Sequence, residues 1–189
     1  MRWLWLWIGL GLAGVASAFG GMWAAHLYFA ELSPRAMPGF DVSLPGGGYT
    51  KDDGSEYGRG KLVIFQVGGV EASVRVEWEP GGLSDDADVA SARKTLAVIH
   101  RGKQRPIDVS TPVAIAGPER TRSFATRAGP ATSWTTEIAC GARRVALVTL
   151  SNHWGVESLH RRVAATFRCH PDAAKEQVIS AGADSAAEE

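Results

Sequence analysis

Cysteine and histidine are the residue types in this chain best suited to nucleophilic chemistry, metal binding or covalent cross-linking. Cys140 follows a strand-like run and precedes a Gly-Ala pair, and Cys169 lies 29 positions further on. A catalytic thiolate needs a base within hydrogen-bond reach, and no motif fixes one; the candidates by type are His100, His153, His160 and His170. Both cysteines, His170 and one more histidine would supply the four ligands of a zinc site, but the spacing of these residues in the sequence matches no zinc motif. A disulfide is the third possibility.

The elements between the two cysteines favour the disulfide. A strand over Arg143 to Leu150 carries the chain about 26 Å away from Cys140, at roughly 3.3 Å per residue. A helix over Val156 to Thr166 returns it by about 16 Å, and the extended residues up to Cys169 add roughly 10 Å. Cys169 thereby returns level with Cys140, within the Cα separation of about 7 Å that a disulfide requires. We predict a Cys140–Cys169 disulfide, with a metal site and free thiols as the alternatives.

Strand-like segments occupy most of the chain around the cysteines. Lys61 to Val67 and Ala72 to Glu79 have strand character and are separated by a Gly-Gly pair, which predicts a hairpin. In its second strand Val74, Val76 and Trp78 alternate with charged residues, so one face is expected to be buried. Further strands are expected at Phe40 to Leu44, Ile107 to Ile115, Arg120 to Thr126, Ser133 to Ala139 and Arg143 to Leu150.

Two segments have helical periodicity. Ser84 and the acidic residues after it suit a helix start, and Val89, Ala92, Leu96 and Ile99 recur at helical spacing. The second helix is the one expected over Val156 to Thr166. Strands and helices in this order predict an α+β domain, a mainly antiparallel β-sheet packed with two helices.

The amino-terminal segment is apolar. Trp3 to Ala30 contains 28 residues without a formal charge, enough to span a bilayer. We expect residues 1–30 to form a transmembrane helix, which Arg2 orients so that the rest of the chain is extracytoplasmic (periplasmic), anchored in the inner membrane by a single pass. The alternative is a signal peptide cleaved after Ala18, which would release a secreted protein.

The remaining boundaries follow from composition. Residues 31–39 contain two prolines and a glycine and are expected to be a linker, residues 40–170 the domain, and residues 171–189 a disordered tail. Small residues recur every four positions in the apolar segment and permit a homodimer by helix pairing; they are Gly9, Ala13, Ser17 and Gly21.

Charge is balanced overall but not along the chain. Twenty basic residues offset twenty acidic ones, which argues against nucleic-acid binding. Residues 41–88 hold ten acids and four bases, whereas residues 93–127 hold eight bases and two acids. Either these are solvated faces of one domain, or the basic stretch binds an anionic partner. The partner-binding candidates are Arg93, Lys94, Arg101, Lys103 and Arg105.

No cofactor or metal motif was found. Trp78, Trp134 and Trp154 are candidates for a sugar or ligand site, although large aromatic residues in a small domain more often fill its core.

Several short strings occur in a recognisable order: FDVSLP, a helix with an acidic start, IAGPERTRSFAT, the hairpin WTTEIACGARRVALVTLS and a helix ending in VAATFRC. This pattern, from Pro38 to Cys169, resembles the PsbP/Mog-like superfamily of α/β sandwiches. The resemblance implies a non-catalytic binding or assembly module and transfers no functional residue; the cysteine pair departs from the family pattern. We therefore expect a non-enzymatic, membrane-tethered binding or assembly module of the cell envelope, with a protein or envelope partner. The alternative is a small envelope hydrolase or transferase whose site has no recognisable motif.

Overall fold

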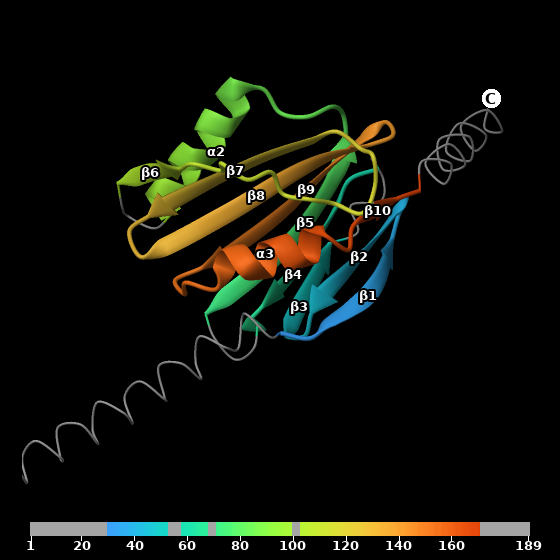
Figure 1. Ribbon diagram of the computed structural model, residues 1–189, viewed down its shortest axis with the longest axis horizontal. Helices are drawn as coiled ribbons and strands as arrows, with labels where there is room; N and C mark the ends of the chain where they lie inside the picture. Colours follow the sequence, from blue (N-terminus) through green and yellow to red (C-terminus); the bar gives the residue numbers. More distant parts are fainter. Residues whose placement is uncertain (1–29, 53–57, 68–70, 100–102, 171–189) are drawn as a thin grey trace, which may run out of the picture.

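A seven-stranded antiparallel sheet forms the centre of the domain (Figure 1). The computed structural model describes residues 30–52, 58–67, 71–99 and 103–170. The strand order of the seven-stranded sheet is β3-β4-β5-β9-β8-β7-β6, and a smaller sheet has the order β1-β2-β10. The elements of the described residues are β1 (Leu32–Met37), β2 (Phe40–Pro45), β3 (Gly48–Asp52), β4 (Gly60–Phe65), β5 (Ala72–Pro80), α2 (Asp86–Ile99), β6 (Gln104–Ile107), β7 (Thr121–Ala128), β8 (Ala131–Cys140), β9 (Arg143–Ser151), α3 (Val156–Ala164) and β10 (Arg168–Cys169).

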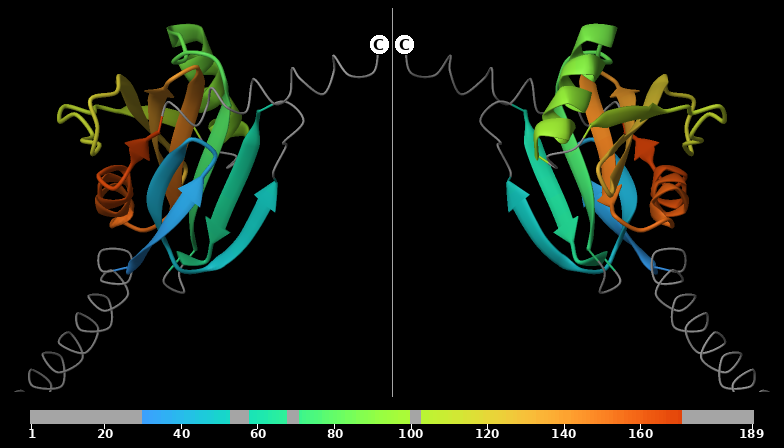
Figure 2. Two further views of the ribbon diagram at one scale, coloured as in Figure 1. Left: turned by 90° about the vertical axis from the view of Figure 1, so that its right-hand side faces the viewer. Right: turned by 90° about the vertical axis from the view of Figure 1, so that its left-hand side faces the viewer.

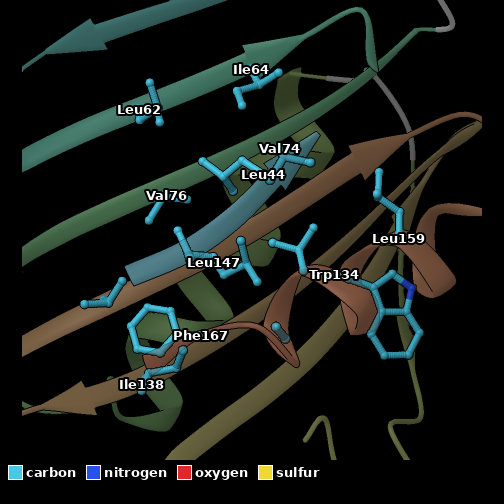
Figure 3. Close-up of a cluster of buried hydrophobic side chains, with 14 of the residues drawn as sticks. Leu44, Leu62, Ile64, Val74, Val76, Trp134, Ile138, Leu147, Leu159 and Phe167 are labelled. Atoms are coloured by element: carbon cyan, nitrogen blue, oxygen red, sulfur yellow. The ribbon is translucent and has the colours of Figure 1, made fainter. Parts of the chain in front are cut away.

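The two helices lie on opposite faces of the large sheet (Figure 2). Helix α3 packs on β8 and β9 and shares its face with the small sheet, whereas α2 lies near β6 and β7 on the other face. The face under α3 holds the hydrophobic core, where side chains of β4, β5, β8 and β9 meet Leu159 of α3, Leu44 of β2 and Phe167 (Figure 3). Phe40 extends this core by stacking on Phe167, with ring centres 5.1 Å apart.

The expected fold class is confirmed, as an α+β domain with a mainly antiparallel sheet and two helices. The expected hairpin is β4 and β5, which pair from Gly60–Trp78 to Phe65–Ser73. Both helices form close to their expected positions.

Two sequence expectations were wrong. Residues 31–39 do not form a linker, because Leu32–Met37 pairs along its whole length with β2. Proline is tolerated there because β1 is an edge strand of the small sheet. The expected strand Ile107 to Ile115 is also absent: β6 ends at Ile107, and the loop after it instead lays Val113 into the core.

The amino-terminal apolar segment, the small residues Gly9, Ala13, Ser17 and Gly21, and the tail 171–189 lie outside the described residues, apart from Ala30 at the end of that segment. Within the part of the chain that the structure describes, neither helix is long and apolar enough to cross a bilayer.

Candidate functional site

Strand β9 shows why the large sheet has two different faces. Val145, Leu147 and Thr149 are buried in the core under α3. The residues between them point to the opposite face, because side chains alternate along a strand. Val148 and Leu150 are only half-buried there, which indicates that α2 covers this face incompletely.

A polar cluster fixes the start of α2 to this second face. The carboxylate of Glu137 on β8 is buried and accepts hydrogen bonds from the backbone N–H of Ser84, at 2.9 Å, and from its hydroxyl, at 2.6 Å. Arg144 of β9 pairs with Glu137 and Glu79. Asp85 caps the helix by accepting a hydrogen bond from the N–H of Asp88 at 2.9 Å. The helix is therefore anchored at its first turn.

Further along, α2 leaves a groove of about 300 Å³ between itself and the sheet. Val89 is its only buried residue with a described side chain, while Ala92, Thr95 and Leu96 line the groove. Arg93 of α2 also lines the groove. The other lining residues come from β4, β5, β7, β8 and β9; they are Lys61, Val63, Ser73, Arg75, Phe124, Thr126, Ser133, Thr135, Val148 and Leu150.

The groove combines an apolar floor with hydrogen-bond donors. Lys61 and Arg75 share the carboxylate of Glu77, at 3.6 Å and 3.3 Å. Arg93 lies with its guanidinium carbon 5.8 Å from the ring centre of Phe124, and no carboxylate among the described residues pairs with it. Its Nε and the hydroxyl of Thr126 are buried and have no hydrogen-bond partner. Unpaired buried donors are costly, so a ligand with an acceptor group would stabilise this part of the groove.

The cysteines form the predicted disulfide. Cys140 of β8 is bonded to Cys169 of β10, with Cα atoms 5.6 Å apart, so the bond ties the small sheet to the large one. The metal and free-thiol alternatives are thereby overturned, because neither sulfur is a thiolate.

Of the described histidines, His160 and His170 have side-chain partners, whereas His153 is half-buried and lines a cavity on the α3 face. His160 of α3 is fully buried, its two ring nitrogens 2.8 Å and 3.0 Å from the hydroxyls of Thr136 and Thr149. Burial, followed by the charge of Arg161, lowers its pKa to about 3. His170 contacts Asp41 at 2.7 Å, and His100 lies outside the described residues.

The basic candidates do not form one surface. Arg93 lines the groove. Arg105 is opposite Arg127 in the sheet, and Arg127 lines a cavity on the α3 face together with Trp134. Lys94 and Lys103 are exposed, and Arg101 lies outside the described residues. The sequence could not have shown this separation, since it depends on which face each strand residue occupies.

The three tryptophan candidates do not form one site either, because two are buried and one is exposed. Trp78 and Trp134 are 3% exposed and belong to the core, whereas Trp154 is 74% exposed in the turn before α3. Trp154 and Trp134 line the second cavity, of about 270 Å³.

Sequence reasoning missed the groove. A signal was present in β9, where Val148 and Leu150 are apolar on the face opposite the core. Among the described residues, no group of three or more metal-ligand side chains is placed to hold a metal ion. No protein-family model matches the chain, and no curated protein is significantly similar to it.

Proposed function

We propose that this chain is a non-enzymatic, membrane-tethered domain on the extracytoplasmic side of the inner membrane, and that it binds a protein or envelope component. The groove between α2 and the second sheet face carries the proposal. Its mixture of apolar and donor side chains is typical of a binding site, and Arg93 and Thr126 supply donors without partners.

The disulfide and the apolar segment support the location. A structural disulfide is typical of an oxidising compartment, such as the periplasm. The 28 uncharged residues that end at Ala30 are long enough for a transmembrane helix.

Binding accounts for the groove better than catalysis does. Its lining contains hydroxyl and cationic side chains but no histidine, cysteine or carboxylate. A serine or threonine nucleophile needs an adjacent base; Lys61 is the lining residue of a suitable type, and it pairs with Glu77 at 3.6 Å. The buried His160 lies on the opposite face, under α3. A binding module is also what the resemblance to the PsbP/Mog-like sandwiches implies.

Blocking the groove tests this function. Ala92 lines the groove from α2 and is exposed, so Ala92→Trp fills the groove without disturbing the core. Ala90 is exposed on the same helix but does not line the groove, which makes Ala90→Trp the matched control. Affinity capture from detergent-solubilised membranes should lose the bound component with Ala92→Trp and keep it with Ala90→Trp. Equal recovery with both variants would contradict binding in the groove.

A further inference from the structure

One end of the domain carries the point where the chain enters from residues 1–29. We call it the tether end and define it by Ala30, Tyr49, Phe65 and Trp154. Strand pairing places these residues at the same end of the domain: Leu32 is opposite Pro45 and Gly48 is opposite Phe65. Across β5, Ser151, just before the turn with Trp154, is opposite Ala72. The tether end therefore extends across both sheets, at the lower left in Figure 1.

The exposed large apolar side chains of the described residues gather at this end. Tyr49 is 59% exposed, Phe65 39% and Trp154 74%. The fourth, Val98, is 71% exposed and lies near the end of α2. The next strand, β6, starts opposite the end of β7, where Gln104 pairs with Ala128. Three of these four are aromatic, and aromatic residues, Trp and Tyr above all, are favoured where one side of a surface meets water and the other meets lipid.

Basic side chains lie at the same end near Trp154, since Arg127 lines the second cavity with it, whereas Tyr49 and Phe65 belong to β3 and β4 at the opposite edge of the large sheet. Lys103 and Arg105 lie at the start of β6, and Arg105 is opposite Arg127 near the end of β7. All three are exposed, and no carboxylate among the described residues pairs with them. Lysine and arginine close to a bilayer are attracted by anionic headgroups.

The chain has little freedom between the apolar segment and the domain. The uncharged segment ends at Ala30, and β1 begins at Leu32. Arg162 of α3 donates a hydrogen bond of 2.7 Å to the carbonyl of Ala30, which fixes this point to the domain. A membrane anchor would thus hold the tether end within a few residues of the bilayer surface.

We propose that the tether end lies against the anionic headgroup layer of the membrane, with Tyr49, Phe65 and Trp154 at the interface and Lys103, Arg105 and Arg127 on lipid phosphates. This inference rests on the proposed tethering. It fixes the orientation of the domain, because contact through one end directs the opposite end, with the Cys140–Cys169 disulfide and the start of α2, away from the membrane.

Fluorine NMR of the full-length chain tests the contact. The protein is labelled with 5-fluorotryptophan and placed in nanodiscs containing anionic phospholipid and a lipid with a gadolinium chelate on its headgroup. Trp154→Phe assigns the Trp154 resonance, and Trp78→Phe assigns that of Trp78. Trp78 is opposite Val145, six residues along β9 from Ser151, about 20 Å further from the tether end.

Paramagnetic broadening falls with the sixth power of distance, so the Trp154 resonance should broaden several-fold more than that of Trp78. Equal broadening, or stronger broadening of Trp78, would overturn the proposal. The resonances of Trp3, Trp5, Trp7 and Trp23 report separately on the tether. If the chain does not associate with nanodiscs at all, the proposed function fails. If it associates and Trp154 is not broadened, only the orientation is wrong.

Charge reversal tests the basic residues. Lys103→Glu with Arg105→Glu should reduce the broadening of Trp154, and nanodiscs of zwitterionic lipid alone should have the same effect. Arg120→Glu with Arg168→Glu is the matched control, since both residues are exposed and lie next to or in strand ends far from the tether end. Broadening that depends on neither charge reversal nor lipid charge would contradict the headgroup contact of these bases.

Discussion

The buried His160 should make the stability of the domain depend on pH. Its imidazole lies between α3 and the sheet, 2.8 Å from the hydroxyl of Thr136 and 3.0 Å from that of Thr149. Protonation would place a charge in a site without solvent, so burial and then the nearby Arg161 lower the pKa from 6.5 to about 3. The folded protein keeps this ring neutral across the range in which an unfolded chain protonates it.

The sign and size of the effect follow from linkage. The unfolded state binds more protons between pH 6.5 and 3, so the stability present above pH 6.5 is lost progressively as the pH falls through this window. At pH 5 the loss from His160 amounts to about 2 kcal/mol, since each pKa unit corresponds to roughly 1.4 kcal/mol.

Urea unfolding of the full-length protein in a non-ionic detergent, followed by circular dichroism at pH 7.5, 6 and 5, measures the effect. His160→Gln removes the titrating ring and should flatten the pH dependence by about 2 kcal/mol between pH 7.5 and 5. The same substitution at the half-buried His153 is the control for removing an imidazole. If wild type and His160→Gln lose stability in parallel on acidification, the ring is not held neutral and the reasoning is wrong.

Three further predictions concern the disulfide, the start of α2 and the anchor. Cys140→Ser opens a loop of 29 residues, which should cost about 3.6 kcal/mol and lower the melting temperature by roughly 10 °C; two titratable thiols in the unreduced wild type would refute the disulfide. Glu137→Ala leaves the backbone N–H and hydroxyl of Ser84 without their acceptor and leaves Arg144 with Glu79 as its remaining carboxylate, and should cost about 2 kcal/mol, with faster amide exchange in the first turn of α2; unchanged exchange would contradict that anchoring. The full-length chain should resist carbonate extraction from membranes with an intact mass, whereas a mature form beginning at Phe19 would establish cleavage.

The sequence predicted those elements whose local pattern agrees with their final environment. The alternation of Val74, Val76 and Trp78 matches a strand with one core face, and α3 has its apolar positions on one side, so both were foreseeable. The disulfide could be placed because the lengths of β9 and α3 return Cys169 to Cys140.

Other elements depended on partners that are distant in sequence. Strand β1 contains Pro34, which argues against a strand, yet pairing with β2 stabilises it at an edge. The apolar residues after Ile107 suggested a strand, but Arg161 of α3 binds the carbonyls of Thr111 and Pro112 and holds this segment as a loop. The groove arises because α2 leaves part of the second sheet face uncovered; Val148 and Leu150 indicate that this face is apolar, but no local pattern specifies how much of it α2 covers.

Site-specific photo-cross-linking in intact cells tests the central claim, that the groove binds a component of the envelope, most directly. A photoreactive benzoylphenylalanine is placed at Thr95, which is exposed and lines the groove, and separately at Ala90, which is exposed outside it. The account predicts a discrete adduct from position 95 that is absent from position 90 and is lost when Ala92→Trp fills the groove. The same adducts from both positions, or an adduct from position 95 that persists with Ala92→Trp, would contradict it.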